Sequence, residues 1–397
     1  MLFLFVLLLS LTGMLKAQVT TAGMSGKVMA DEESVIGATV VAVHEPSGTS
    51  YGTVTNVDGR FSLQGMRSGG PYKVTVSYIG YQTAIYTGIQ LQLGETYSLN
   101  VTLHEASELL GEITITASRS KFSAEKTGAT TNISSEQLTT LPSINRSISD
   151  FTRISPYASG NSFGGRDGRS NTFTVDGANL NNNFGLSSGL PGGGNPISLD
   201  AIDEVQVVIA PYDVRQANFI GAGINAITKS GTNAYRGSAY MYFNNEVMRG
   251  NKIGDTDFGV RAEESKTVYG ATFGGPIIKD KLFFFANVEY EKSPQQVITW
   301  RAAKEGETPN NSTISRTTEA DLAEFSQILK DKYGYNTGSF TDFPADVTNL
   351  KLLGRIDWNI NQGNKLSVRY NFTNNKTWEA PNGSSGNTGY RLAYNRV

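Results

Sequence analysis

Two patterns of apolar and polar positions divide the chain. Between residues 25 and 103, seven short apolar-rich runs alternate with turn residues, a spacing that predicts a small β-sandwich. The runs cover residues 26–28, 38–43, 52–54, 60–63, 72–79, 89–93 and 97–103. After residue 234 the runs lengthen to roughly 10 residues, and every second side chain is apolar, as in a transmembrane β-barrel.

The long runs each have one apolar and one polar face. The apolar positions are Leu282, Phe284, Ala286, Val288 and Tyr290; Leu352, Gly354, Ile356, Trp358 and Ile360; and Leu366, Val368, Tyr370 and Phe372. In a barrel the apolar face meets lipid and the polar face a wet lumen, although a half-buried soluble sheet gives the same alternation. Tight turns at residues 279–280 and 361–363, opposite a long polar connection at 292–348, favour the barrel. Within that connection, residues 319–333 predict a packed amphipathic helix.

A third type of sequence lies between these two parts. Residues 172–175, 202–209 and 224–228 form short β-type runs, each bounded by turn signals, and predict a compact sheet-based module. Upstream, one short helix is predicted to start at Ser134 or Ser135 and to end before Pro142. A second short helix is predicted to start near Ser143 or Asn145.

The N-terminus predicts export. Residues 2–11 are apolar apart from Ser10, and a short exit segment ends at Ala17, after which a signal peptidase is expected to cleave. A transmembrane helix needs about 20 apolar residues, which is more than this segment supplies. Membrane insertion would therefore have to use strands.

Composition excludes several classes of protein. The net charge of -2 supplies no basic face for nucleic acid, and the absence of cysteine excludes disulfides and thiolate metal sites. We find no nucleophile and base pair and no metal cluster, and the histidines, His44 and His104, stand alone, so we expect neither an enzyme nor a cofactor. Asn56 and Asp58 are interpreted as a turn, because the other carboxylates of a calcium loop are missing.

A glycine pattern at residues 221–226 matches a dinucleotide-binding fingerprint. That fingerprint must open a helix, whereas residues 227–233 are β-formers followed by a turn. We therefore expect these glycines to pack a strand against a barrel wall.

Two parts of the sequence resemble known families. Residues 26–28, 36–38, 55–61 and 76–81 resemble a carboxypeptidase-regulatory-like domain. Residues 141–147, 173–177, 196–207, 210–216, 221–233 and 274–285 resemble the Oar-like branch of TonB-dependent outer-membrane receptors, whose Bacteroidetes members carry such a sandwich before the plug. The expected fold is mainly β: a β-sandwich, an α+β plug domain and the first strands of an antiparallel transmembrane β-barrel.

The resemblance implies a domain plan. It consists of a signal peptide (1–17), the sandwich (18–105), a linker (106–123), the plug (124–233) and the start of the barrel (234–397). About five strands follow residue 234, whereas plugged transporters close with about 22, so an N-terminal fragment of a longer receptor is expected. The expected location is the outer membrane of a Gram-negative cell, in contact with its lipid.

The resemblance also implies partners. TonB, with its inner-membrane complex, would bind a TonB box formed by Glu112, Ile113, Thr114, Ile115 and Thr116. An extended segment can add to the edge of a partner's sheet, but this run could equally be the last strand of the sandwich. Pulling on it would rearrange the plug and admit an extracellular ligand, which could be a peptide or protein, a glycan or a chelate. An adhesion protein without transport is the alternative.

Two further groups of residues are candidates within the plug. Ligand-facing positions are Arg166, Asp167, Arg169, Asn181, Asn182, Asn183 and Phe184, which could also belong to simple connectors. Ion pairs between plug and barrel wall are expected from Asp176, Asp200, Asp203, Glu204 and Arg215, although most such charges only solvate a surface.

Overall fold

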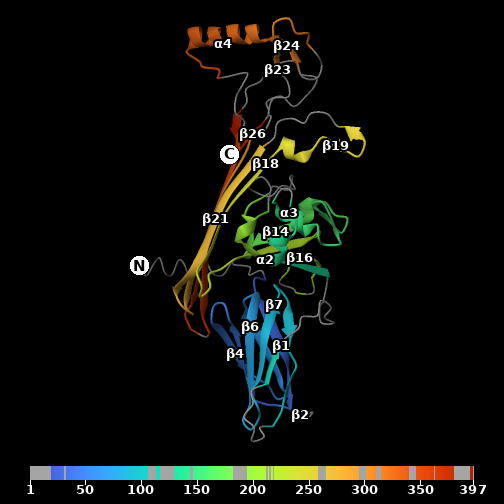
Figure 1. The fold of residues 1–397 in the computed structure, drawn as a ribbon, viewed down its shortest axis with the longest axis vertical. Coiled ribbons are helices and arrows are strands. Elements are labelled where there is room, and N and C mark those ends of the chain that lie inside the picture. The colour runs from blue at the N-terminus through green and yellow to red at the C-terminus, as the bar shows by residue number, and fades with distance from the viewer. Residues whose placement is uncertain are drawn as a thin grey trace. The chain divides into compact units, whose positions relative to one another are not determined.

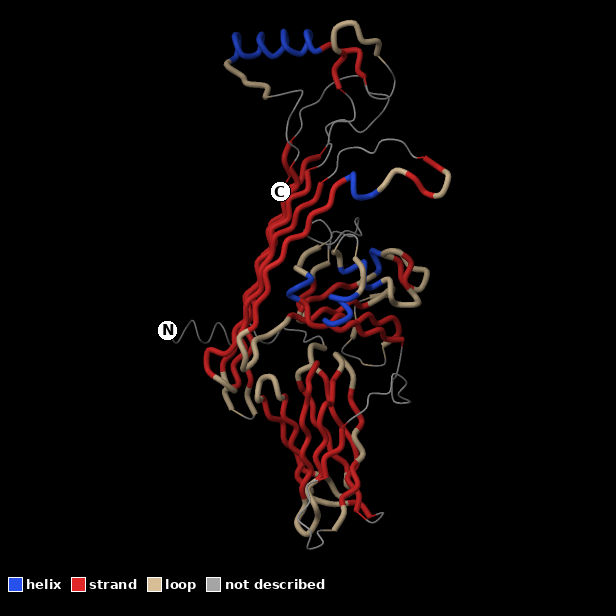
Figure 2. The backbone as a smooth tube through the Cα atoms, in the orientation of Figure 1, coloured by secondary structure: helices blue, strands red, loops and turns tan. Residues whose placement is uncertain are grey.

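The fold is mainly β (Figures 1 and 2). The computed structural model describes residues 19–30, 33–105, 113–116, 129–143, 146–181, 195–211, 213, 216–217, 219–257, 265–294, 301–309, 314–338, 346–361, 363–379 and 394–396. One compact unit comprises Met1–Ser238, Thr272–Asn287 and Leu353–Asn371, and a second comprises Ala239–Ala271, Val288–Leu352 and Phe372–Val397. The predicted signal peptide lies outside the described residues.

The N-terminal part is the predicted β-sandwich. Its strands are β1 (Ala22–Ala30), β2 (Glu33–Ser34), β3 (Thr39–His44), β4 (Thr49–Val54), β5 (Arg60–Met66), β6 (Gly69–Ser77), β7 (Ala84–Leu91), β8 (Thr96–Ser98), β9 (Val101–Leu103) and β10 (Ile113–Thr116). One sheet has the order β2-β1-β5 with β8 and β9 also on β1, and the other has the order β10-β7-β6-β3-β4. Alternate side chains of both sheets, among them Val40, Phe61 and Val74, form one core.

The turn between β4 and β5 explains the role of Asn56. Its side-chain oxygen accepts hydrogen bonds from the backbone N–H groups of Asp58 and Arg60, and Gly59 has φ of 73°. A side chain engaged in this way closes a turn, which agrees with the turn interpretation of Asn56 and Asp58.

His44 does not stand alone, which corrects the sequence interpretation. Its Nδ1 lies 2.7 Å from Ser47 Oγ, and Ser47 Oγ lies 2.8 Å from Thr49 Oγ1. All three side chains are buried, so the chain of hydrogen bonds stabilises the β3–β4 turn and leaves no access for a substrate.

His44 makes the stability of the sandwich pH-dependent. Burial, and secondarily the charge of Arg67, lowers its pKa from 6.5 to about 3. Below pH 6.5 the His44 imidazole is therefore protonated in the unfolded chain, whereas in the folded chain it stays neutral down to about pH 3. We expect the free energy of unfolding to fall by up to about 1.4 kcal/mol per pH unit across this window.

Urea unfolding of residues 19–105 between pH 7 and 5 measures this effect. The His44→Gln variant should lose stability less steeply over that range, because it removes the histidine proton. Equal slopes for the two proteins would contradict the prediction.

The central module comprises residues 129–228. Its elements are β11 (Ala129–Ser134), α2 (Ser135–Thr140), α3 (Ile148–Thr152), β12 (Ala158–Ser159), β13 (Ser162–Phe163), η2 (Gly168–Ser170), β14 (Thr172–Val175), β15 (Ala178–Asn179), η3 (Leu199–Ala201), β16 (Ile202–Ala210) and β17 (Gly223–Thr228). The main sheet has the order β11-β16-β17-β14-β15, in which only β14 and β17 pair in parallel. Its three predicted strands are confirmed.

The two helices start where capping residues allow. Ser134 caps α2 in a capping box with Gln137, as predicted, and Pro142 follows its end. Ser147 caps α3 with Asp150, so this helix begins later than the predicted Ser143 or Asn145. The sequence interpretation missed the Ser147 cap because Ile144, Ile148 and Phe151 already had helical spacing.

The C-terminal sheet has the order β18-β21-β22-β25-β26-β27. These strands are β18 (Arg236–Asn245), β21 (Ser265–Ile278), β22 (Leu282–Pro294), β25 (Asp346–Asn359), β26 (Lys365–Glu379) and β27 (Tyr394–Arg396), and the shorter elements are η4 (Glu246–Arg249), β19 (Lys252–Ile253), β20 (Thr256–Asp257), β23 (Arg301–Ala303), β24 (Ile314–Thr318) and α4 (Glu319–Tyr333). Spatial order follows chain order, as in an up-and-down barrel.

The predicted alternation is confirmed on these strands. Exposed large apolar side chains include Val288, Tyr290, Ile356, Trp358, Leu366, Val368 and Tyr370, which form the face expected to meet lipid. The opposite face is not simply wet, which corrects the prediction. Lys351, Arg355 and Asp357 are buried there, in hydrogen bonds and ion pairs.

The helix α4 has the predicted bounds but is only lightly packed, because it contacts the short strands β23 and β24 with a half-buried face that includes Leu322 and Leu329. Thr318 and Asp321 form a capping box at its start, and Gly334 ends it in the left-handed conformation. None of its residues is buried, and Phe325 is 58% exposed, so the helix is packed less closely than expected. Within the described part of the chain, no helix is long and apolar enough to cross a membrane.

Candidate functional site

A cluster of buried charges joins the central module to the C-terminal sheet. Asp176 and Gly177 form the two-residue turn between β14 and β15, with φ of 50° and 85°. The Asp176 carboxylate accepts hydrogen bonds from Thr228 N–H at 3.0 Å and Thr228 Oγ1 at 2.6 Å. The turn is thereby fixed to the end of β17, with its carboxylate only 7% exposed.

Arginines of the C-terminal sheet face this carboxylate. Arg369 Nε of β26 lies 3.4 Å from Asp176 Oδ2, and Arg355 Nη1 of β25 lies 4.0 Å from Oδ1. Arg355 also donates to the carbonyl of Thr228 at 2.5 Å. The contact therefore combines charge with hydrogen bonds to the same strand end, which is the arrangement that compensates the desolvation of buried ions.

Asp357 gathers further donors beside this contact. It receives two parallel hydrogen bonds from Arg355, at 2.7 and 3.0 Å, and one from Ser367 Oγ at 2.6 Å. Arg67, at the end of β5 in the sandwich, reaches Asp357 Oδ2 at 3.4 Å. The cluster thus includes a residue from each of the three β-parts.

The Asp203 carboxyl interacts electrostatically with the arginines of the same cluster. Burial raises its pKa, and the charges of Arg67, Lys229 and Arg355 oppose that rise. Burial also lowers the pKa of Arg67, opposed mainly by Asp357. We define the ionic junction as Asp176, Asp203, Arg67, Arg355, Asp357 and Arg369.

The other predicted ion-pair residues lie elsewhere. Asp200 pairs with Arg146 inside the central module. Glu204 accepts hydrogen bonds from the backbone N–H of Leu93 in the sandwich, with both carboxylate oxygens at 3.1 Å. Arg215 lies outside the described residues. Sequence reasoning missed Arg67, Arg355, Asp357 and Arg369 as junction residues. The last three had charge at alternate strand positions as their only signal, and Arg67 had none.

The predicted ligand-facing residues divide into two groups. Arg166, Asp167 and Arg169 are exposed, and Asp167 and Arg169 form an ion pair at 2.9 Å. The hydrogen bonds from Arg169 lower the pKa of Asp167. Asn181 instead holds the module together, because it accepts from Phe173 N–H and donates to the carbonyl of Asn171. Asn182, Asn183 and Phe184 lie outside the described residues.

The predicted TonB box contains a strand. The structure pairs Ile113–Thr116 in parallel with residues 84–87 of β7, at the edge of a sandwich sheet. This agrees with the interpretation of the segment as the last strand of the sandwich. It leaves partner binding untested, and Glu112 lies outside the described residues.

The glycines of the false dinucleotide motif have a local role. A Cβ on Gly221 would stand 2.3 Å from Asn171 Oδ1, and one on Gly223 would stand 2.6 Å from the Phe219 ring. They pack within the central module, so the expected contact with a barrel wall is wrong for these two residues. Gly223 leads into a strand, which agrees with rejection of the nucleotide site.

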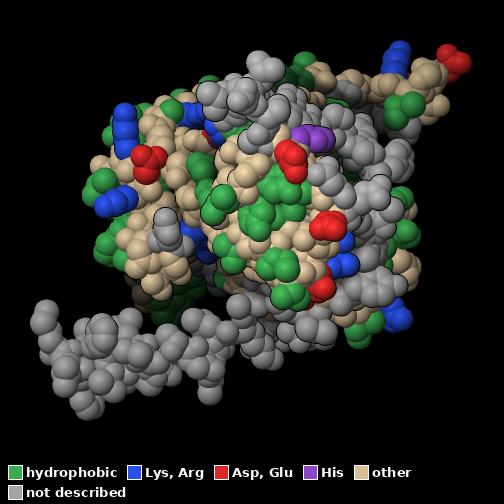
Figure 3. Space-filling model, turned by 90° about the horizontal axis from the view of Figure 1, so that it is seen from below, with side chains coloured by type: hydrophobic (Ala, Val, Ile, Leu, Met, Phe, Trp, Pro, Cys, Tyr) green, Lys and Arg blue, Asp and Glu red, His purple; other side chains and the backbone are tan. Residues whose placement is uncertain are grey.

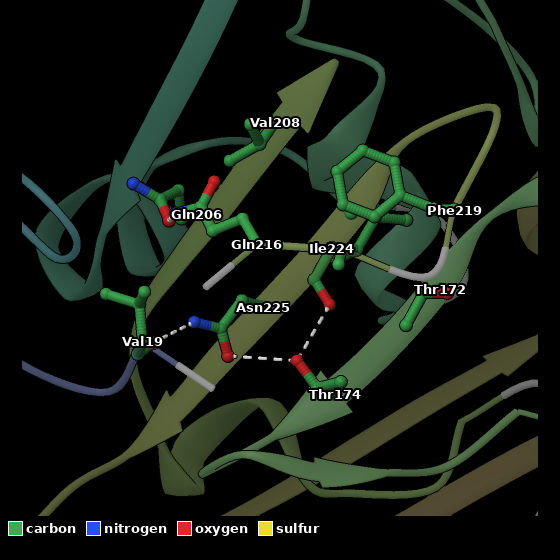
Figure 4. A pocket seen from close by; sticks show the side chains of 11 residues that line it. Val19, Thr172, Thr174, Gln206, Val208, Gln216, Phe219, Ile224 and Asn225 are labelled. Atoms are coloured by element: carbon green, nitrogen blue, oxygen red, sulfur yellow. Dashed lines mark hydrogen bonds between the residues drawn. The ribbon is translucent and has the colours of Figure 1, made fainter. Parts of the chain in front are cut away.

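Beside Gly223 lies an open pocket (Figure 4). Its polar side chains form hydrogen bonds with one another and with Val19, the first residue that the structure describes. Asn225 accepts a hydrogen bond from Thr174 Oγ1 and donates to the carbonyl of Val19, and Gln216 donates to Gln206. Val19, which follows the expected cleavage site at Ala17 by two residues, therefore lines the pocket.

In the view of Figure 3, acidic and basic side chains are interspersed around apolar ones, without a basic patch. Among the described residues, no three His, Asp or Glu side chains gather as metal ligands would.

Two family models match separate parts of the chain. Residues 23–104 match the carboxypeptidase regulatory-like domain, and residues 227–396 match an outer membrane beta barrel domain. The chain thus combines the sandwich expected from its sequence with strands typical of outer-membrane β-barrel proteins, and neither match is to an enzyme.

One curated relative covers most of the chain. The TonB-dependent transporter Oar of Myxococcus xanthus is 25% identical over 344 residues, which is 82% of this chain and 30% of that protein. Two solved structures show partial likeness. The siderophore receptor PirA of Acinetobacter baumannii has 20% identity and a TM-score of 0.39, over 62% of this chain and 31% of that one. The outer membrane transporter YddB of Escherichia coli has 14% sequence identity and a TM-score of 0.40, and the match covers 64% of this chain and 34% of that one.

Proposed function

We propose that the chain carries the sandwich, the plug and the first barrel strands of a TonB-dependent transporter that moves a large ligand across an outer membrane. The central module acts as the plug, and the C-terminal sheet is part of the barrel wall. The observation that carries this proposal is the ionic junction, in which the turn of Asp176 is held by Arg355 and Arg369 of strands whose other face is exposed and apolar.

A plug held in this way needs an external source of energy to move. The outer membrane has no nucleotide supply, so the energy must come from a partner anchored in the inner membrane. The segment of Glu112 to Thr116 supplies a point of attachment, because an extended strand can add to a partner's sheet edge. The similarity to a TonB-dependent transporter supports TonB as that partner.

Binding to TonB is the first prediction of this proposal. A peptide spanning residues 110–117 should bind a TonB C-terminal domain in calorimetry, because its backbone supplies the ladder hydrogen bonds. A peptide with Ile115→Pro should not bind, since proline removes a donor and cannot pair within a strand. Absence of binding by the unaltered peptide would reject the TonB box.

Uptake separates transport from the second candidate, adhesion. Deletion of residues 112–116 should abolish uptake while surface display is retained.

The helix α4 favours adhesion, because none of its residues is buried and its apolar Phe325 and Ile328 are exposed. Partner binding that survives the deletion, with no uptake by the intact receptor, would establish adhesion instead.

A further inference from the structure

The sandwich makes hydrogen bonds with β11 and β16, two neighbouring strands of the central module. Leu93, in the turn after β7, donates its backbone N–H to Glu204 and accepts from Gln206 Nε2 at 2.6 Å and Asn132 Nδ2 at 3.2 Å. Leu93 and Gln206 are at most 1% exposed. Buried hydrogen bonds of this kind are costly to break singly, because each leaves a polar group without water.

A different side of the sandwich binds the C-terminal sheet. Arg67 pairs with Asp357, and Asn359 Nδ2 donates to Thr49 Oγ1 at 3.0 Å. Lys365 Nζ lies 3.2 Å from the centre of the Tyr51 ring, which is a cation–π contact. These contacts come from two strands of the sheet and from β4 and the end of β5, whereas the central module is held through the Leu93 turn.

We propose that the sandwich is a clasp: it stays attached to the C-terminal sheet and holds the central module closed through Leu93. The inference rests on the proposed transport function. Opening then requires Glu204 and Gln206 to leave Leu93 while Arg67 remains with Asp357. The strand Ile113–Thr116 pairs with Ala84–Thr87 of β7, and three further residues lie between that pairing and Leu91, the last residue of β7. A pull on the segment therefore acts on the strand that leads to the Leu93 turn.

Engineered cysteine pairs test the clasp without background, because the chain contains no cysteine. A Cβ on Gly94 would stand 3.2 Å from Gln206 Cδ, so the thiols of Gly94→Cys and Gln206→Cys would lie within the span of a short bis-methanethiosulfonate cross-linker, which forms a disulfide with each thiol. A Cβ on Gly48 would stand 2.8 Å from Asp280 Cγ, so Gly48→Cys with Asp280→Cys places a second such pair between the sandwich and the C-terminal sheet. Both pairs are treated with this reagent in cells that express the receptor, and a reductant reverses the cross-link.

The proposal expects both pairs to cross-link, with opposite effects on uptake. The Gly94→Cys, Gln206→Cys cross-link should abolish uptake, and a reductant should restore it. The Gly48→Cys, Asp280→Cys cross-link should leave uptake equal to that of its reduced form. Uptake through the cross-linked first pair, loss of uptake in the cross-linked second pair, or failure of the reagent to cross-link either pair would overturn the clasp. If the cysteine-free parent shows no uptake, the transport function fails, while cross-linking still decides whether the sandwich holds both partners.

Discussion

Replacing Asp176 by Asn should release the Asp176 turn of the central module from strands β25 and β26 of the C-terminal sheet. Asparagine tolerates the left-handed conformation at this position, so the backbone is preserved and the change isolates the charge. Arg355 and Arg369 then lose a buried counter-charge, and Thr228 loses one of its two acceptors. Arg355 keeps Asp357 as a counter-charge and the main loss falls on Arg369, so the cost should be at the low end for breaking a buried pair, about 3 kcal/mol. Hydrogen exchange of residues 172–175 and 223–228 should therefore accelerate by roughly 100-fold or more.

The pair of Asp167 and Arg169 supplies the matched control. It has the same two residue types in the same module, but its side chains are more than half exposed. Solvent screens such a pair, so Asp167→Asn should leave the exchange of both strands unchanged. If Asp176→Asn exchanged as slowly as Asp167→Asn, the ionic junction would have no role in holding the turn.

The contacts of Arg355 bear on how much it would cost to separate the Asp176 turn from the buried ionic junction. Arg355 binds Asp357 with two parallel hydrogen bonds, which fix the guanidinium plane, and presents its remaining edge to Thr228. Arg355 therefore has its main counter-charge within the C-terminal sheet, whereas Arg369 pairs with Asp176 of the central module. In the proposed transport function, Asp357 would still neutralise Arg355 after the Asp176 turn had moved away, which would lower the cost of the open state.

Local structure in the central module follows from sequence. Asp176 and Gly177 are residues that a two-residue hairpin turn requires, and Ser134 with Gln137 is a capping box, so both were predictable from short-range rules. The alternation on β22, β25 and β26 likewise predicted which face is apolar. These features depend on neighbours within a few residues along the chain.

Partners far apart in sequence could not be predicted in the same way. Alternation places Arg355 and Asp357 on one face of a strand but does not name what covers that face. Arg67 lies 290 residues before Asp357, and no pattern in the sandwich marks it as a junction residue. The same limit applies to the parallel pairing of β10 with β7, because a short apolar run indicates a strand without indicating its neighbour.

The sequence places Gly26 in a family motif but does not show why the position needs glycine. It lies in β1 between the segments that pair with β8 and with β9, where the chain of residues 99–100 passes close to it. A Cβ on Gly26 would stand 1.8 Å from the carbonyl oxygen of Leu99, a backbone atom that cannot rotate away. We therefore expect Gly26→Ala to cost about 3 kcal/mol or more, which is a large part of the stability of a small domain.

Gly52 separates this steric effect from the general effect of losing a glycine. It also lies in a strand of the sandwich, but a Cβ there would meet only Val40 O at 4.0 Å, which is an ordinary contact. Gly52→Ala should be neutral or slightly stabilising, since alanine reduces the entropy of the unfolded chain. Urea unfolding of residues 19–105 compares the two variants. Similar midpoints would show that β1 can move away from Leu99, and the close approach of these backbones would then not be what keeps glycine at position 26.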